Sequence, residues 1–353
     1  MTISIKPSQD HPDVSIVMPC RNEEAHIAQC IQSVLDQDYP ADNYELLIVD
    51  GMSDDQTRKI VHDNFGNTEN IRVIDNPART TPHALNAGIK NARGQIIMIM
   101  GAHAHYASDY VSKCVKSLLS TDADNVGGIC RVLCDDKNLL HRSIAAALSS
   151  PFGVGNSYFR IGTAERRYVD TVFGGCYRKE IFEKIGLFDT DLLRGQDTEF
   201  NARLRKNGGK ILLDPQIVSA YVARDTLKKL VKMEWQYGYF KPLVIKKVGG
   251  LFTLRQTVPP AFVLTLGILL VTSFFSLLSF YILLSLLLLY LSVNIPASTS
   301  IALRKGIGQI LFLPVIFAII HFCWGTGFLA GTIDFILLSK ESKEGLTDIS
   351  LTR

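Results

Sequence analysis

Two carboxylates stand two residues apart in Arg194-Gly195-Gln196-Asp197-Thr198-Glu199-Phe200-Asn201-Ala202-Arg203-Leu204-Arg205. Phe200 and Leu204 are spaced as one apolar stripe of a helix, so a helix is expected here. Asp197 and Glu199 then fall in its first turn, where the helix N-terminus favours negative charge. A carboxylate held there stays ionised at neutral pH and can accept a proton, which makes Asp197 a candidate general base. The alternative is that Asp197 only caps the helix.

The chain of 353 residues carries a net charge of +3 and is 47% apolar, but its apolar residues are unevenly spread. No charged residue occurs from position 256 to 303, and Asp334 is the only one from 306 to 339. Both runs exceed the ~18–20 apolar residues that span a bilayer. The sequence therefore predicts a membrane protein with a soluble N-terminal part. No basic patch interleaved with aromatic residues suggests nucleic acid as a partner.

Strand-like and helix-like patterns alternate over the first hundred residues or so. Strands are expected at 14–19, 46–49, 71–74 and 95–100, and helices at 22–35, 56–64 and 81–91. This alternation predicts crossover units and a mainly parallel sheet. Ligands of such sheets bind beyond the carboxyl ends of the strands. Glu23, Asp50 and the turn at 101–105 are expected on that edge.

Five motifs occur in the order and at the spacing found in family 2 glycosyltransferases. They are Pro19-Cys20-Arg21-Asn22-Glu23, Asp50-Gly51-x-Ser53-x-Asp55-x-Thr57, Ala84-Leu85-Asn86-x-Gly88, Ala92-Arg93-Gly94 and Gly195-Gln196-Asp197-Thr198-Glu199. The chain resembles that family over about residues 12–245. Stretches 173–180, 184–189 and 208–215 look most like the membrane-attached enzymes of bacterial exopolysaccharide assembly, of the succinoglycan type.

The resemblance implies an α/β chain with the GT-A fold of nucleotide-diphospho-sugar transferases. It implies an inverting transfer in which Asp197 is the catalytic base. The Pro19–Glu23 loop and Asp50 would hold the base and ribose of the donor, and Arg93 would lie near its diphosphate. The full set of implied substrate-binding residues is Pro19, Arg21, Glu23, Asp50, Ser53, Asn86, Arg93, Arg178 and Glu199.

The expected metal site departs from the family pattern. Relatives end the fourth strand with Asp-x-Asp or Asp-x-His, whose first Asp helps to hold Mg²⁺ or Mn²⁺, whereas this chain has Gly101-Ala102-His103-Ala104-His105. Three interpretations stay open. A divalent metal binds through His103, with Mn²⁺ better suited to imidazole than Mg²⁺. Alternatively, cationic side chains such as Arg93 or Arg178 replace the metal, or the site is weakened and the chain only binds.

The remaining chain is expected to be membrane-associated. We expect a GT-A domain over 1–226, amphipathic interfacial helices over 227–257, three or four transmembrane helices over 258–339 and a polar tail over 340–353. Lysines and aromatic residues between 227 and 247 suit an anionic membrane surface. A turn near 273–279 is expected, because 261–293 would measure ~50 Å as one helix.

The sequence thus predicts a membrane enzyme that transfers a hexose from a nucleotide-diphospho-sugar, with a UDP-sugar as the expected donor, to a lipid-linked saccharide in surface or exopolysaccharide assembly. It would be multi-pass in the inner (cytoplasmic) membrane, with its catalytic domain in the cytoplasm, because residues 1–14 lack a secretory signal. The alternative is a catalytically silent scaffold that binds nucleotide or lipid. A processive synthase is disfavoured, because the Gln-x-x-Arg-Trp of those enzymes is missing.

Overall fold

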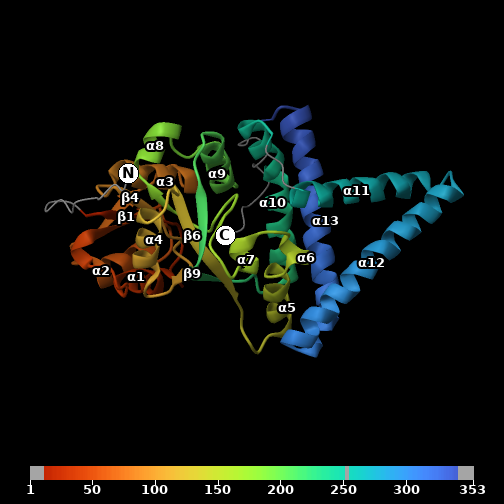
Figure 1. Cartoon of the computed structure of the whole chain (residues 1–353), viewed down its shortest axis with the longest axis horizontal. Helices are drawn as coiled ribbons and strands as arrows, with labels where there is room; N and C mark the ends of the chain where they lie inside the picture. The colour runs from red at the N-terminus through yellow and green to blue at the C-terminus, as the bar shows by residue number, and fades with distance from the viewer. Residues whose placement is uncertain (1–11, 251–253, 341–353) are drawn as a thin grey trace. The chain divides into compact units, whose positions relative to one another are not determined.

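The computed structural model describes residues 12–250 and 254–340, which form two compact units (Figure 1). The α/β unit comprises the chain up to Arg131 together with Gly162–Val222, and the helical unit comprises Val132–Ile161 and the chain from Ala223 onward. In this division Val132–Ile161 lies in the helical unit, inside the range 1–226 that was expected to form the GT-A domain. The predicted tail over 341–353 lies outside the described residues.

The α/β unit is built on a nine-stranded sheet with the strand order β3-β2-β1-β4-β8-β6-β9-β5, and β7 also pairs with β9. The strands are β1 (Val14–Cys20), β2 (Tyr44–Asp50), β3 (Ile71–Asp75), β4 (Ile96–Ile99), β5 (Ala104–Tyr106), β6 (Asn125–Leu133), β7 (Arg167–Tyr168), β8 (Cys176–Arg178) and β9 (Ile211–Val222). Strands β1 to β4 are parallel, whereas β8 runs antiparallel to β4. The sheet is therefore mixed, and not mainly parallel as the sequence suggested.

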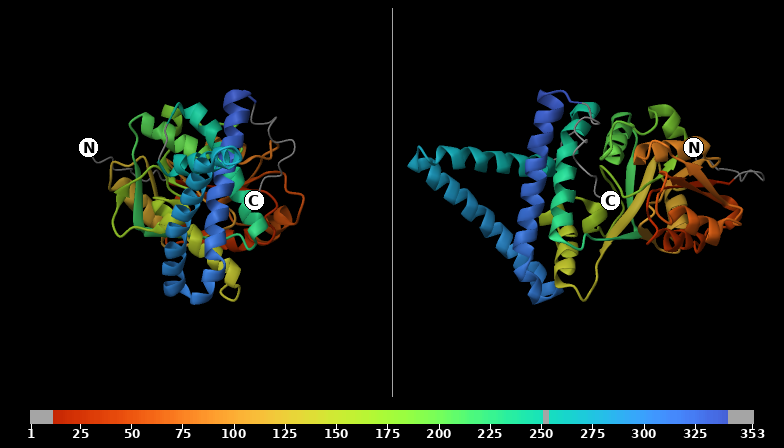
Figure 2. Two further views of the ribbon diagram at one scale, coloured as in Figure 1. Left: turned by 90° about the vertical axis from the view of Figure 1, so that its right-hand side faces the viewer. Right: turned by 180° about the vertical axis from the view of Figure 1, so that it is seen from behind.

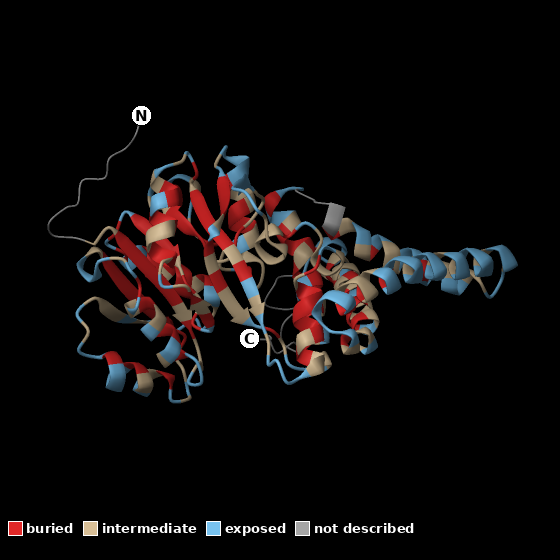
Figure 3. Cartoon of the chain, turned by 60° about the horizontal axis from the view of Figure 1, so that its bottom comes forward, coloured by how far each residue is buried: buried red, intermediate tan, exposed pale blue. Residues whose placement is uncertain are grey.

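Helices cover the sheet of this unit (Figure 1). They are α1 (Ile27–Leu35), a short 3-10 helix (Ala41–Asn43), α2 (Thr57–Phe65), α3 (Thr81–Asn91), α4 (Tyr110–Leu119), α8 (Glu180–Ile185) and α9 (Gln196–Lys206). Strands β1 and β2 are buried on both faces, which explains why they read as almost continuous apolar runs (Figure 3). All seven elements predicted before residue 101 are present.

The parallel register brings the carboxyl ends of the first four strands to one edge. Cys20 pairs with Asp50, and Asp50 pairs with Asp75. On the other side of β1, the N–H of Met100 donates to the carbonyl of Val17 at 3.1 Å. The loops that follow these strands therefore meet at one edge of the sheet, which we call the ligand edge.

The helical unit contains α5 (Leu139–Leu148), α6 (Pro151–Val154), α7 (Tyr158–Ile161), α10 (Leu227–Val248), α11 (Leu254–Thr272), α12 (Leu277–Lys305), a 3-10 helix (Ile307–Leu311) and α13 (Leu313–Thr332), which ends in a π-helical turn (Ile333–Leu337) (Figure 2). Leu277–Lys305 and Leu313–Leu337 are long and apolar enough to cross a membrane. The break between α11 and α12 falls at residues 273–276, inside the expected turn.

Candidate active site

The loops after β1 and β2 are joined into one structure at the ligand edge. The N–H of Gly51 donates to the carbonyl of Cys20 at 2.8 Å, and the N–H of Asn22 donates to Ser53 Oγ at 2.9 Å. Asn22 also exchanges two hydrogen bonds with Asp54, at 2.5 and 2.9 Å. Asn22 adopts a left-handed backbone with φ 52°, which these bonds hold in place. The motif beginning at Pro19 and the motif beginning at Asp50 therefore form one rigid surface.

Asp50 lies at the centre of this surface and is only 1% exposed. Its carboxylate accepts hydrogen bonds from the Ser53 hydroxyl at 2.5 Å, the Ser53 N–H at 3.0 Å and Arg58 Nε at 2.5 Å. Burial alone would raise the pKa of Asp50, but the bonds from Ser53 and Arg58 outweigh burial and lower that pKa. Asp50 is therefore ionised, and both of its carboxylate oxygens already accept hydrogen bonds from Ser53 or Arg58.

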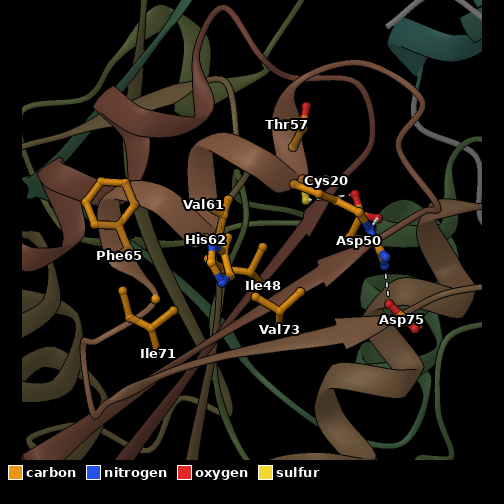
Figure 4. A pocket seen from close by; sticks show the side chains of 12 residues that line it. Cys20, Ile48, Asp50, Thr57, Val61, His62, Phe65, Ile71, Val73 and Asp75 are labelled. Atoms are coloured by element: carbon orange, nitrogen blue, oxygen red, sulfur yellow. Dashed lines mark hydrogen bonds and ion pairs between the residues drawn. The ribbon is translucent and has the colours of Figure 1, made fainter.

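Arg58 connects Asp50 to Asp75, whose carboxylate accepts a second bond from the same guanidinium. These groups stand at one end of a groove of about 430 Å³ between α2 and the edge strand β3 (Figure 4). Apolar side chains line its remainder, among them Val61, Phe65 and Val73. Asp50 and Arg58 both line this groove, and they are paired with each other there. The prediction from sequence missed Arg58. Its position was a usable signal, because Arg58 directly follows Thr57 at the start of the helix after the acidic turn.

Arg21 is the positively charged side chain of the joined loops. Its side chain lies against Gly51, where an added Cβ would meet the Arg21 side chain at 3.1 Å. The Nε of Arg21 is buried and has no hydrogen-bond partner in the described part of the chain. Arg21 therefore places a guanidinium beside the turn that begins at Asp50.

Glu23 and His103 come together at the ligand edge. Nδ1 of His103 lies 3.6 Å from Oε1 of Glu23, and the N–H of Glu23 donates to Thr57 Oγ1 at 2.7 Å. An ideal Cβ built on Gly101 has nothing within 4 Å, so there is open space at the position where the family resemblance implies an acidic side chain. His105 lies in β5 and pairs with Ala220 of β9.

A divalent metal fits this arrangement only with help from its substrate. Within residues 12–250 and 254–340, no three His, Cys, Asp or Glu side chains are grouped closely enough to hold a metal ion. Glu23 and His103 offer one oxygen and one nitrogen, and Mg²⁺ or Mn²⁺ held by one or two side chains takes its other ligands from phosphate and water. The residues present therefore suit a metal that arrives with a diphosphate.

Asp197 lies in the first turn of α9, just after Gly195, whose φ of 79° suits glycine. Its carboxylate is exposed, and Oδ1 accepts a bond from the N–H of Thr198 at 2.8 Å. The Tyr177 hydroxyl lies 3.5 Å from Oδ1 of Asn201, one turn further along α9, and the negative charge of Asp197 adds to burial in raising the pKa of Tyr177. The Tyr177 hydroxyl contacts the carbonyl of Gly174, and Gly174 abuts Ile99 at the carboxyl end of β4. Asp197 is therefore an outward-facing carboxylate at the ligand edge.

Glu199 has a different role from the expected one. Its buried carboxylate forms two hydrogen bonds to Arg203, at 2.7 and 2.9 Å. Arg203 also donates to the carbonyls of Ile185, Gly186 and Leu187. The prediction that Glu199 binds substrate is wrong, because its carboxylate is used to fix the turn that precedes α9.

Two predicted arginines lie at the opposite edge of the sheet. Arg178 pairs with Ile96 at the amino end of β4, and its guanidinium donates to the carbonyls of Leu118, Thr121 and Ala123. Arg93 precedes the same end of β4, and its side chain is exposed. The expectation that either arginine faces the donor diphosphate, or replaces a metal there, is therefore wrong.

Asn86 also has a structural role. Its amide donates to the carbonyl of Phe188 at 2.8 Å and accepts from the N–H of Phe188 at 2.9 Å. Phe188 packs against Phe200 of α9, with ring centroids 4.5 Å apart. The predicted substrate contact of Asn86 is corrected to a link between α3 and the segment that carries Asp197.

The comparisons agree with this fold. Residues 15–186 match the family model described as Glycosyl transferase family 2. The chain is 33% identical over 328 residues to the dolichyl N-acetyl-alpha-D-glucosaminyl phosphate 3-beta-D-2,3-diacetamido-2,3-dideoxy-beta-D-glucuronosyltransferase of Methanococcus voltae, covering 91% of this chain and 97% of that protein. The chain belongs to glycosyltransferase family 2 and is a glycosyltransferase of the GT-A fold.

A further curated protein and one solved structure are also similar to this chain. The succinoglycan biosynthesis protein ExoA of Rhizobium meliloti (strain 1021) is 30% identical over 227 residues, covering 64% of this chain and 67% of that protein. The solved structure of the mannosyltransferase PcManGT from Pyrobaculum calidifontis, in complex with GDP-Man and Mn²⁺, is 19% identical with a TM-score of 0.59, covering 94% of this chain and 89% of that one. At this identity the structural likeness shows the fold alone.

Proposed function

We propose that this glycosyltransferase moves a hexose from a nucleotide-diphospho-sugar, most simply a UDP-sugar, to a saccharide carried on a membrane lipid. The observation that carries this proposal is the exposed carboxylate of Asp197 at the start of α9, on the edge where the parallel strands end. The acceptor class is supported by the Methanococcus voltae relative, whose name specifies a dolichyl phosphate sugar. The ExoA relative supports a role in surface or exopolysaccharide assembly.

The reaction needs one proton acceptor and one stabilised leaving group. Asp197 takes the proton of the acceptor hydroxyl as its oxygen attacks the anomeric carbon. The bond from that carbon to the donor diphosphate breaks, and the nucleoside diphosphate leaves with the electron pair. Attack opposite the leaving group inverts the anomeric configuration. Asp197 supplies only the proton acceptor, and the reaction also needs positive charge at the diphosphate to stabilise the leaving group.

Arg21 is the side chain that we assign to the donor, because its buried Nε lacks an acceptor in the described residues. Glu23 and His103 are the residues that would hold Mn²⁺ or Mg²⁺, which when bound supplies further charge stabilisation at the diphosphate. Pro19, Asp50 and Ser53 shape the joined loops on which the nucleoside would rest. We expect EDTA to remove activity and Mn²⁺ to restore it; activity untouched by chelation contradicts the metal.

We place the enzyme at the cytoplasmic face of the cell membrane, because lysines between 227 and 247 and the basic residues at 304–305 flank the apolar helices. The test is a donor screen that follows UDP release with membrane extract as acceptor. Release that depends on both donor and extract supports the proposal.

A catalytically silent scaffold is the second candidate, and the replacement of the acidic metal ligand by Gly101 is the observation that favours it. Isothermal titration with UDP-sugars, beside a turnover assay, separates the two functions. Donor binding without turnover on any acceptor would favour the scaffold.

A further inference from the structure

The helical unit contains a hairpin, α11 and α12, whose surface is almost entirely apolar. No charged residue occurs between positions 256 and 303. At the tip, Phe274 and Phe275 are 79% and 88% exposed, and the neighbouring leucines of α12 are exposed as well (Figure 3). Exposed apolar surface of this extent is not found on proteins surrounded by water, so the hairpin lies in an apolar medium.

The polar groups at the tip are satisfied within the hairpin itself. The N–H groups of residues 273–276 all donate to carbonyls of residues 269–272. The hydroxyls of Thr272 and Ser273 donate to backbone carbonyls at 2.9 and 2.7 Å, and that of Ser276 accepts from the N–H of Ser279 at 3.4 Å. A turn in water can bond its polar groups to water, whereas a turn in hydrocarbon must pair them within the protein.

The parts of the hairpin that extend beyond α13 are too short to cross a bilayer, although α12 as a whole is long enough. Helix α11 leaves α13 near Gly325, where an added Cβ would lie 2.7 Å from Val263, and α12 returns to α13 where the Tyr290 hydroxyl lies 3.0 Å from His321 Nδ1. Beyond these contacts, residues 264–272 reach ~14 Å and residues 277–289 reach ~20 Å. The hydrocarbon core is ~30 Å thick, so a tip supported by the shorter arm ends near its middle.

Helix α13 lies between this hairpin and the lysine-bearing helix α10 (Figure 2). Glycines of α13 allow α10 and α13 to lie close together. A Cβ added to Gly327 would lie 2.2 Å from the carbonyl oxygen of Trp235, and a Cβ added to Gly331 would lie 2.0 Å from that of Tyr239. Exposed lysines stand at both ends of α10, at 228–229 and 246–247, and basic residues flank α13 at 304–305 and 340. If the pair crossed the membrane, half of these cations would face the outside, against the positive-inside rule.

We propose that α10 and α13 lie along the cytoplasmic surface of the membrane and that α11 and α12 form a re-entrant hairpin, with Phe274 and Phe275 inside the lipid. The occupant of the exposed apolar surface is therefore lipid acyl chains. Basic residues at positions 255 and 304–305 place both ends of the hairpin on the same side. The multi-pass arrangement expected from the lengths of the apolar runs is replaced by insertion from one face. This inference rests on the membrane location proposed above.

The test is the accessibility of Phe275→Cys to a membrane-impermeant maleimide, in right-side-out and inside-out vesicles. Five of the seven natural cysteines are buried, so replacing the other two, by Cys134→Ser and Cys323→Ser, leaves little labelling from natural cysteines. Ile307→Cys, at an exposed position at the base, is the matched control. We expect the control to react only from the cytoplasmic face, and Phe275→Cys to react from neither face, at about a tenth of the control rate or less, as burial in hydrocarbon requires.

Three outcomes overturn the inference. Reaction of Phe275→Cys from the outer face shows a full crossing, and reaction from the cytoplasmic face shows a hairpin in water. Oxidative cross-linking between two copies through Phe275→Cys shows that a second chain, and not lipid, covers the tip. Absence of the chain from the membrane fraction is a separate result, which contradicts the membrane location and not the hairpin alone.

Discussion

The pair formed by Glu199 and Arg203 gives a direct test of how the turn before α9 is held. Their side chains are 6% and 24% exposed. Glu199→Ala leaves the Arg203 cation among three carbonyls without its carboxylate. Removing one partner of a buried pair costs about 3–5 kcal/mol, and partial exposure of Arg203 favours the lower end. A loss of ~3 kcal/mol corresponds to a fall in Tm of roughly 6–12 °C for a unit of this size.

The assay is thermal unfolding of the full chain in detergent, combined with titration of the donor sugar. We expect Glu199→Ala to lower the Tm and to leave donor affinity at temperatures below unfolding nearly unchanged. Arg203→Met combined with Glu199→Ala removes both charges and should be more stable than Glu199→Ala alone. An unchanged Tm together with a donor affinity weakened tenfold or more (~1.4 kcal/mol) would refute this reasoning and restore the substrate contact that the sequence suggested.

Three further predictions concern the helical unit and the metal. Burial raises the pKa of Glu234 from 4.5 to about 7. The folded chain therefore keeps the proton of Glu234 over a pH range in which the unfolded chain has released it. The stability that this proton contributes is complete below the unfolded pKa of 4.5 and is lost as the pH rises through 7. Glu234→Gln should therefore flatten the pH dependence of unfolding and be more stable at pH 8, by ~3 kcal/mol; an unchanged pH profile contradicts this. Gly331→Leu should destabilise the α10–α13 contact by ~3 kcal/mol, whereas Gly267→Ala, where an added Cβ meets nothing within 4 Å, should be harmless in the same melting experiment. Gly101→Asp should tighten Mn²⁺ binding in the presence of UDP about tenfold by electron paramagnetic resonance, since it adds a carboxylate ligand; unchanged binding places the metal elsewhere.

Local patterns were sufficient to predict the first half of the fold. Strands β1 and β2 are fully buried runs, and α1 buries one face through Ile27, Ile31 and Val34. The antiparallel part was missed because β8 has three residues, too few to show a period. The assignment of Val132–Ile161 to the helical unit depends on contacts distant in sequence, which no local pattern reports.

Motif order identified the family but not the edge on which each residue lies. Arg178 matches a family stretch, yet β8 runs antiparallel to β4 and carries it to the amino end. Glu199 stands two residues after Asp197 in the sequence, and helical positions two apart point in different directions. The Asp197 carboxylate is therefore exposed, whereas the Glu199 carboxylate is buried against Arg203. Direction and burial are tertiary properties, so the order of the motifs alone does not report them.

The most direct test of the catalytic assignment is the turnover of Asp197→Asn, with donor affinity measured on the same preparation. The side chains have nearly the same shape, but the amide cannot accept the proton of the acceptor hydroxyl. We predict a fall in kcat of roughly 10²–10⁴-fold with donor affinity nearly intact, beside an unaffected Asp63→Asn control on the exposed surface of α2. An Asp197→Asn enzyme that keeps its turnover would contradict the assignment of this carboxylate as the base.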